Sequence, residues 1–218
     1  IASEMWESKD FVLPHLNGEK YPDKPPVHFW LIILFSLPFG KVTELSARLP
    51  SAMAGIGCVI TIYYLGKQIF PGVAGGIINS QSATDNHRSS ILNTERICFL
   101  AALILATSIE FLTVSRRVSF DVLLTFFVTL SLFCFYTGYT RKERNTKFFL
   151  LSYMFMGIAT LTKGPVGFAI PILVISTFLC IVKFKNYQTE FRVRDMHIGL
   201  GGLIAFSIPL LWVLGIYL

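Results

Sequence analysis

The sequence predicts an all-α, polytopic membrane protein. Of its 218 residues, 53% are hydrophobic and only 15% are charged, and the mean hydropathy is +0.61. In soluble domains, about a quarter of the residues are charged. Apolar segments of membrane-spanning length also recur along the chain, and polar stretches separate them. Together these observations exclude an ordinary soluble globular protein.

The length of each apolar run defines the expected elements. Residues 1–26 are polar and proline-rich, and 27–39 are apolar but only about half as long as a span. We expect 27–39 to lie along the membrane surface and to turn sharply at Pro38-Phe39-Gly40. Residues 1–48 then form a non-cytoplasmic loop with juxtamembrane amphipathic helices. About six transmembrane segments follow within 49–218, at 49–69, 97–114, 122–140, 147–162, 165–183 and 198–218.

Three further features complete the expected organisation. Residues 71–96 are rich in Gly, Ser and Asn, lack a hydrophobic period and are expected to form a flexible cytoplasmic loop. Gly201 and Gly202 favour close packing of the last span on a neighbour. The chain opens without an initiator Met and stops inside an apolar run at Leu218, so we expect a fragment cut at both ends.

Charge predicts the orientation of these spans. The net charge is +6, but most basic residues cluster between apolar spans, which indicates membrane topology rather than nucleic-acid binding. If 27–39 does not cross, one side of the membrane receives most of them, and the positive-inside rule makes that side cytoplasmic. These residues are Lys67, Arg88, Arg96, Arg141, Lys142, Arg144, Lys147, Lys183, Lys185, Arg192 and Arg194.

Three polar islands fall on the opposite side. The first holds His15 and the Asp23–Lys24 pair, which Pro22, Pro25 and Pro26 display on stiff backbone. The second is 115–121, and the third is 160–165. Positive charges there oppose the topological bias, and anionic lipid phosphates would account for Lys24, Arg116 and Lys163.

Each island also has an ordinary explanation that the residues leave open. The proline-rich segment around Lys24 could be a linker before a helix. Lys163 could be a snorkelling lysine, and Arg116 and Asp121 could form an ion pair that ties two helix ends. A lone histidine such as His15 is most often a surface residue.

Two residue types within the spans need separate interpretation. Glu110, near the outer end of its span, is expected either to relay protons or to pair with a neighbouring Arg or hydroxyl. Cys58, Cys98, Cys134 and Cys180 all fall in apolar spans without metal-ligand spacing, which indicates buried small hydrophobic residues.

Several motifs in the same order resemble a known family. These are the run from Met5 to Gly18, Tyr21-Pro22-Asp23-Lys24-Pro25-Pro26, Ala47-Arg48-Leu49-Pro50-Ser51, Ala101 to Thr107, Arg116 through Phe127, and Leu161-Thr162-Lys163-Gly164-Pro165. They resemble the polyprenyl-phosphate-dependent glycosyltransferases of GT-C type. The similarity is greatest to the aminoarabinose transferase of lipid A modification and its kin, near the protein mannosyltransferases.

The resemblance implies a transferase of the plasma membrane whose site faces the periplasm or exterior. Such enzymes move a sugar from undecaprenyl or dolichyl phosphate to a lipid, such as lipid A, or to a protein. Lys24, Arg116 and Lys163 are expected to bind the donor phosphate, because cations stabilise a phosphate leaving group. Asp121 is a supporting catalytic residue, while the family's main catalytic Asp lies upstream of Ile1.

The resemblance also implies ligands around this centre. His15 and Tyr21 are expected to bind substrate. Asp23 occupies the position of an acidic residue that helps bind a divalent metal in the aminoarabinose transferase. No nucleotide or redox cofactor and no nucleic acid is expected.

Two departures qualify the resemblance. The chain starts after the family's Asp-Glu pair, so this fragment alone is expected to be inactive. The 71–96 loop replaces a tight turn. The alternative function is a polyprenyl-lipid transporter or flippase, or a non-catalytic carrier-lipid-binding protein, because charges and Gly/Pro breaks in spans suit a transporter too.

Overall fold

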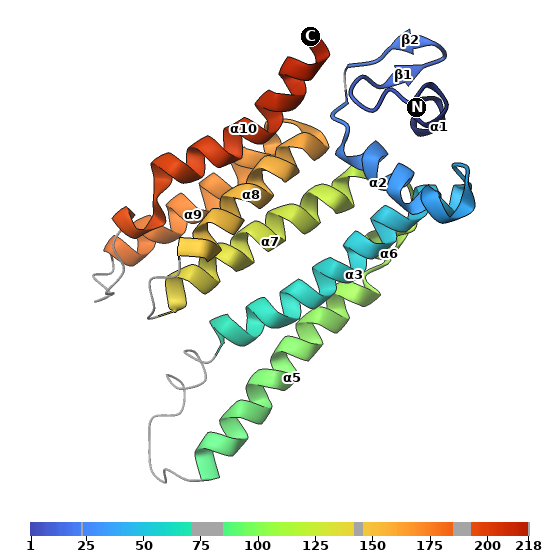
Figure 1. Ribbon diagram of the computed structural model, residues 1–218. Coiled ribbons are helices and arrows are strands. Elements are labelled where there is room, and N and C mark those ends of the chain that lie inside the picture. Colours follow the sequence, from blue (N-terminus) through green and yellow to red (C-terminus); the bar gives the residue numbers. More distant parts are fainter. Residues whose placement is uncertain (23, 71–84, 142–145, 185–192, 218) are drawn as a thin grey trace.

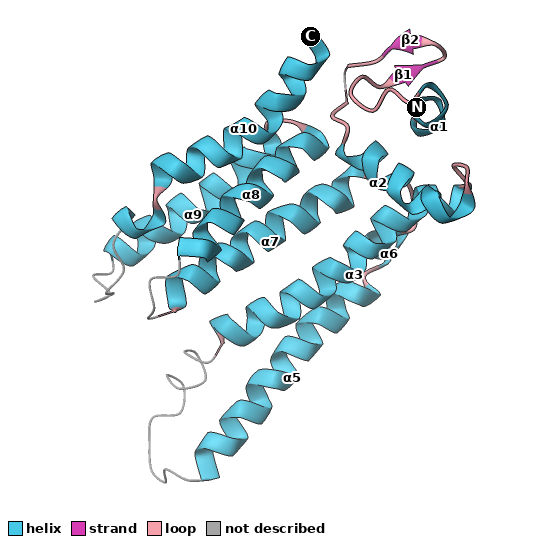
Figure 2. Ribbon diagram, in the orientation of Figure 1, coloured by secondary structure: helices cyan, strands magenta, loops and turns pink. Residues whose placement is uncertain are grey.

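The computed structural model describes residues 1–22, 24–70, 85–141, 146–184 and 193–217 (Figure 1). Helices account for nearly all of the secondary structure, as Figure 2 shows, so the all-α prediction is confirmed in its main point. The structure adds one antiparallel β-hairpin, in which β1 (His15–Leu16) pairs with β2 (Glu19–Lys20). Asn17 and Gly18, both with positive φ, form its turn, as expected of an Asn-Gly dipeptide.

Two helices precede the spans. Helix α1 (Ala2–Ser8) buries Ala2 and Met5 and exposes polar residues, so it is amphipathic. Helix α2 (Val27–Ser36) ends in a 3-10 turn, η1 (Leu37–Phe39), with Gly40 in the left-handed region, which confirms the sharp turn. The amphipathic character predicted for this segment is wrong, because α2 is apolar on its outer face too.

The long helices confirm the polytopic prediction and correct its details. Among the described residues, four helices are long and apolar enough to cross a membrane: α3 (Glu44–Ile69), α7 (Phe120–Thr140), α9 (Val166–Phe184) and α10 (Ile198–Tyr217). A fifth candidate span is broken. It consists of α5 (Asp85–Thr107) and α6 (Ile109–Ser115), which meet at Ser108 with a bend of 63°.

Two expectations therefore change. Helix α5 already begins at Asp85, within the range predicted as a flexible loop, whereas 71–84 lie outside the described residues. Helix α8 (Thr146–Lys163) is not among the four, since lysines occupy its ends and hydroxyl side chains line its buried face. This helix packs against α7, α9 and α10, and the hydroxyl side chains of Ser152, Thr160 and Thr162 are buried within the protein.

Hydroxyl pairs and small residues hold the helices together. Ser131 on α7 and Ser152 on α8 each donate a hydrogen bond to the other's carbonyl oxygen, at 3.1 and 2.9 Å. Gly201 on α10 faces Tyr153, and a Cβ added to this glycine would lie 2.1 Å from the ring, which confirms the predicted close packing there. Gly202 meets no atom within 4 Å of such a Cβ. Polar pairs and small residues are the usual means of helix association in a bilayer.

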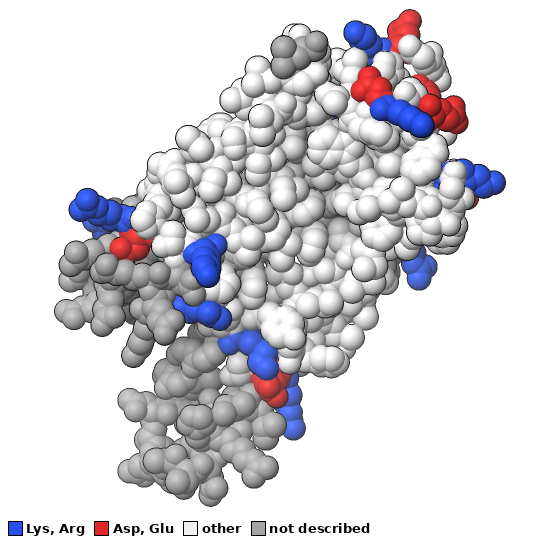
Figure 3. Space-filling view, viewed as in Figure 1, with Lys and Arg blue, Asp and Glu red and all other residues white. Residues whose placement is uncertain are grey.

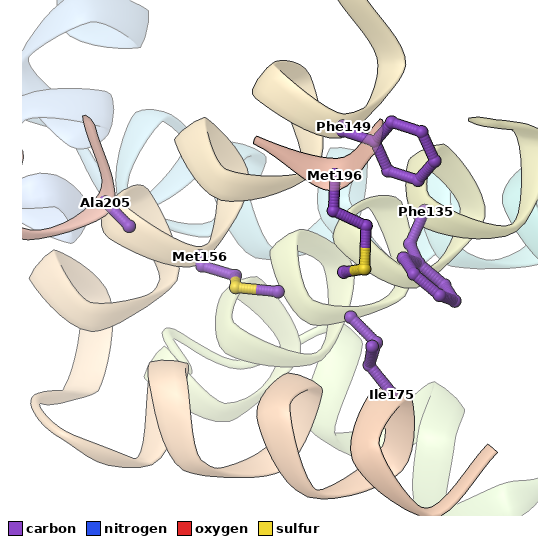
Figure 4. Close-up of a cluster of buried hydrophobic side chains, with 6 residues drawn as sticks. All are labelled: Phe135, Phe149, Met156, Ile175, Met196 and Ala205. Carbon is purple, nitrogen blue, oxygen red and sulfur yellow. The ribbon is translucent and has the colours of Figure 1, made fainter. Parts of the chain in front are cut away.

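The largest buried apolar cluster lies where α7, α8, α9 and α10 meet, away from the hairpin. Figure 4 shows its side chains converging: Phe135, Phe149, Met156, Ile175, Met196 and Ala205. A second cluster joins α1 to α2 through Met5, Phe29 and Ile32. The N-terminal segment is therefore packed as part of the fold.

Candidate functional site

Polar contacts of the N-terminal segment all gather at one end of the bundle. Figure 3 shows that the charged side chains visible on this face lie toward its two ends and leave an uncharged band between them. At one end, Lys67 on α3 pairs with Glu95 on α5 at 2.9 Å. At the other, the indole of Trp212 on α10 donates to the carbonyl of Val12 at 2.9 Å. The charges predicted that the helix ends fall into two groups on opposite sides, and the structure confirms this arrangement.

The turn between α6 and α7 is fixed to α3 by one buried serine. The Ser51 hydroxyl donates to the carbonyl of Ser119 at 3.2 Å and accepts from its N–H at 3.0 Å. The Ser119 side chain in turn caps α7 by accepting from the N–H of Asp121 at 3.2 Å. These bonds define the positions of Phe120 and Asp121, the first two residues of α7.

Lys24 rests on this helix start. Its ammonium lies 4.9 Å from the centroid of the Phe120 ring, and the side chain is exposed while Pro26 is buried. A cation over an exposed aromatic ring contributes about 0.5–1 kcal/mol. The lysine is therefore anchored through its contact with Phe120, yet its charge stays accessible to a ligand.

Asp121 and Lys163 form an ion pair that joins the second and third polar islands. Their side chains keep 62% and 47% of their surface exposed, so a phosphate could still reach the ammonium. Lys163 ends α8, and Gly164 follows with φ of 83° and donates to the carbonyl of Thr160 at 2.7 Å. The alternative that Asp121 pairs with Arg116 is wrong, because Lys163 takes that position.

His28 is a site residue that the sequence analysis missed. Its ring is fully buried on α2, 4.3 Å from the Phe120 centroid, and neither ring nitrogen has a hydrogen-bond partner among the described residues. Burial, together with the nearby charge of Lys24, lowers the pKa of His28 to about 4. The only sequence signal is a polar residue inside the apolar run Val27-His28-Phe29-Trp30.

The remaining predicted residues lie apart from this centre or outside the described chain. His15 and Tyr21 flank the hairpin, and no described hydrogen bond, ion pair or ring contact joins them to Lys24, Asp121 or Lys163. Arg116 is exposed at the end of α6 and lines a different pocket. Asp23 lies outside the described residues. Their predicted roles stay predictions.

The metal prediction likewise stays a prediction. Within the described parts of the chain, no three His, Cys, Asp or Glu side chains are grouped so that they could hold a metal ion.

A pocket of about 300 Å³ opens beside Asp121. Ser108 and Glu110, at the break between α5 and α6, line it together with Asp121 and Thr125 of α7. Glu110 makes no ion pair with any residue that the structure describes, so the expectation that it pairs with an Arg is not supported. Its walls are otherwise apolar, with Phe111, Val114 and Val122, so these few hydroxyl and carboxylate oxygens are the groups that can accept hydrogen bonds from a polyhydroxylated ligand.

Comparison with known families decides the assignment. A protein-family model described as dolichyl-phosphate-mannose-protein mannosyltransferase matches residues 90–218 of this chain. A second family model of the same description matches residues 23–79. The chain belongs to this family. Both Lys24 and the Asp121–Lys163 pair fall in the matched ranges.

Individual relatives agree with this membership. An uncharacterised protein of Aquifex aeolicus is 31% identical over 198 residues, which cover 88% of this chain and 35% of the relative. The undecaprenyl phosphate-alpha-4-amino-4-deoxy-L-arabinose arabinosyl transferase 2 of Proteus mirabilis is 24% identical and covers 99% of this chain and 34% of its own length. The chain thus spans about a third of the length of these relatives.

Solved structures show the same fold. Structures of ArnT from Cupriavidus metallidurans, in the apo state and bound to undecaprenyl phosphate, each match 98% of this chain with a TM-score of 0.76 and 22% identity. The match covers 35% of the ArnT chain. The GT-C architecture expected from the sequence is therefore confirmed.

Proposed function

We propose that the full-length protein is a membrane glycosyltransferase that takes a sugar from a polyprenyl-phosphate carrier and passes it to a lipid or protein acceptor. The observation that carries the proposal is that Lys24 lies over Phe120 while Lys163 pairs with the next residue, Asp121, so that both ammonium groups are held at the start of α7. Membership of the mannosyltransferase family supports it, as does the donor in the names of the arabinosyl transferase relatives.

The chemistry follows from these charges. In transfer, the bond between the anomeric carbon and the phosphate oxygen breaks while an acceptor oxygen forms a new bond to that carbon. Negative charge grows on the departing phosphate, and the ammonium groups of Lys24 and Lys163 would stabilise it. The acceptor's proton passes to a carboxylate base. The resemblance assigns that role to a residue upstream of Ile1 and gives Asp121 a supporting role.

The pocket beside Asp121 suits the sugar of the donor. Its hydroxyl and carboxylate groups lie next to the proposed phosphate site, at the break between α5 and α6. A transporter would instead require polar groups near the middle of the membrane. Ser131 and Ser152, which lie along α7 and α8, bond to each other, and the charged contacts described above lie at helix ends.

We also propose that the Lys24 end faces the periplasm or exterior. The opposite end collects Lys67, Arg96, Arg141, Lys147, Lys183 and Arg194, which supports a cytoplasmic position. The donor phosphate would then be bound at the non-cytoplasmic surface.

Replacement of Lys24 by alanine tests the function. In the full-length protein, reconstituted in vesicles with undecaprenyl-phosphate-linked sugar and a lipid A acceptor, we expect Lys24→Ala to reduce release of free undecaprenyl phosphate at least about 100-fold. The matched control is Lys20→Ala, which removes an exposed lysine from β2 and should retain full activity. Undiminished release by Lys24→Ala would contradict the assignment.

A further inference from the structure

A second pocket, on another side of α6, carries a feature that the proposed function does not use. It has a volume of about 250 Å³ and lies between α3 and the broken α5–α6 span. Its lining is almost entirely apolar, with Ile56 and Val59 from α3 and Phe111 and Leu112 from α6. None of Lys24, Phe120, Asp121 or Lys163 lines it.

The polar end of this pocket is made by Ser115 and Arg116. Ser115 is 8% exposed, and its hydroxyl has no hydrogen-bond partner among the described residues. A buried hydroxyl without a partner is unfavourable, and a ligand that forms a hydrogen bond with it would remove that cost. Arg116 is exposed and makes no ion pair with any residue in the described chain.

Close packing of α6 on α3 explains how the hydroxyl comes to be buried. A Cβ at Gly55 would lie 2.7 Å from the Ser115 hydroxyl, so only glycine permits this approach. Apart from Arg116, the exposed residues that line the pocket include the apolar Ile56 and Leu112. Such a surface at a span is in contact with lipid.

We infer that this pocket binds an anionic phospholipid of the surrounding bilayer. One acyl chain lies along the apolar walls, the Arg116 guanidinium pairs with the phosphate, and the Ser115 hydroxyl donates to an oxygen of the same head group. Arginine is well suited to phosphate because its planar group donates two parallel hydrogen bonds. Bilayer phospholipid is the favoured occupant because the pocket opens among lipid-facing side chains. Among the described lining residues it shares only Phe111 with the pocket beside Asp121, and none of Lys24, Phe120, Asp121 or Lys163 lines it.

Binding of phosphatidylglycerol to the purified full-length protein tests the inference, by native mass spectrometry or by thermal stabilisation in detergent. We expect Arg116→Gln to weaken phosphatidylglycerol binding at least about tenfold, because the variant loses a charge-assisted, hydrogen-bonded pair with the phosphate. The matched control is Arg117→Gln, which removes the adjacent exposed arginine that does not line the pocket. It should weaken binding less, by about fivefold at most, because it loses only the general attraction of one basic residue to an anionic lipid.

A second variant tests the apolar part. Ala52→Phe would fill the pocket from the α3 side and should also lose the bound lipid. If Ala52→Phe fails to fold, Arg116→Gln still tests the inference, because it changes only an exposed side chain. Equal binding by Arg116→Gln and Arg117→Gln would overturn the inference. Equal binding of phosphatidylcholine, or equal protection by inorganic phosphate, would also overturn the inference. Displacement of phosphatidylglycerol by stoichiometric undecaprenyl phosphate would overturn it too, because that result would assign the pocket to the carrier. None of these readouts depends on sugar transfer.

Discussion

Phe120 is the residue around which the candidate site is organised. Its ring contacts the Lys24 ammonium, the His28 imidazole and the Phe29 ring, at 4.9, 4.3 and 5.7 Å between centres. The next residue, Asp121, carries the ion pair with Lys163. One helix start therefore holds groups from α2, α7, α8 and the proline-rich segment, although they are far apart in the sequence.

Loss of the Asp121 charge should affect activity much more than stability. An exposed ion pair contributes only about 0–1 kcal/mol to folding, so Asp121→Asn should melt close to the parent protein. Transfer should nevertheless fall about 100-fold, because the variant cannot orient Lys163 toward the phosphate. Melting curves and release of undecaprenyl phosphate measure the two effects.

The exposed Arg48–Glu44 pair on α3 provides the control for this experiment. Glu44→Gln removes a similar pair away from the centre and should leave transfer unchanged. An equal loss of transfer in both variants would show that Asp121 has no particular role.

His28 should make stability depend on pH. Its pKa in the folded protein is lowered to about 4, so the folded state keeps it neutral while the unfolded state binds a proton below about pH 6.5. Its contribution is therefore constant above pH 6.5 and is lost as pH falls toward 4, by about 3 kcal/mol in total. Melting temperatures of the full-length protein and His28→Leu between pH 7.5 and 4.5 should show the steeper decline only for the parent. Parallel curves would contradict this expectation.

At the scale of elements, the N-terminal segment is held by side chains from distant helices. The indoles of Trp30 on α2 and Trp212 on α10 donate to the carbonyls of Phe11 and Val12, at 2.6 and 2.9 Å. Glu4 on α1 accepts the N–H groups of the hairpin turn at Asn17 and Gly18, and these bonds lower the pKa of its carboxyl. The proline-rich segment follows directly from this fixed hairpin.

Trp212→Phe should loosen the segment without removing the ring packing. The variant keeps an aromatic ring, although a smaller one, and lacks the indole N–H donor; one hydrogen bond contributes about 1 kcal/mol. We therefore expect amide exchange around Val12 to become about fivefold faster. Hydrogen exchange with mass spectrometry measures this, and Trp6→Phe, on α1, serves as the control. Unchanged exchange near Val12 would show that the bond does not hold the segment.

The sequence predicts some of these elements and not others, for physical reasons. Apolar runs give the spans, and the Pro38-Phe39-Gly40 turn follows from local chemistry. The break at Ser108 has no proline or glycine to signal it. Likewise, the pairing of Asp121 with Lys163 depends on how α7 packs against α8, which no local pattern encodes. His28 was missed because an apolar run around one histidine resembles a core helix.

At the scale of the whole molecule, charge separates the two ends. Lys24 and Asp121 lie at the start of α7 and Lys163 lies at the end of α8, whereas Arg141 follows the other end of α7 and Lys183 lies in the last turn of α9. This grouping could be predicted by counting the spans, because each span carries the chain to the other side of the membrane. It required 27–39 to be counted as non-crossing, and its helix is indeed too short to be among the candidate spans.

Cysteine labelling of the full-length protein in intact cells tests the orientation that this separation predicts. Cys180 is exposed, so the prediction that all four cysteines are buried is wrong for this residue. In a Cys180→Ser background, which removes that thiol, Glu19→Cys on the hairpin should react with a membrane-impermeant maleimide. Arg141→Cys, at the end of α7, should react only after the cells are permeabilised, because the positive-inside rule places that end in the cytoplasm. The reverse pattern would put Lys24 and its phosphate site on the cytoplasmic face, and donor binding at the outer surface would then be wrong even if Lys24→Ala abolished transfer.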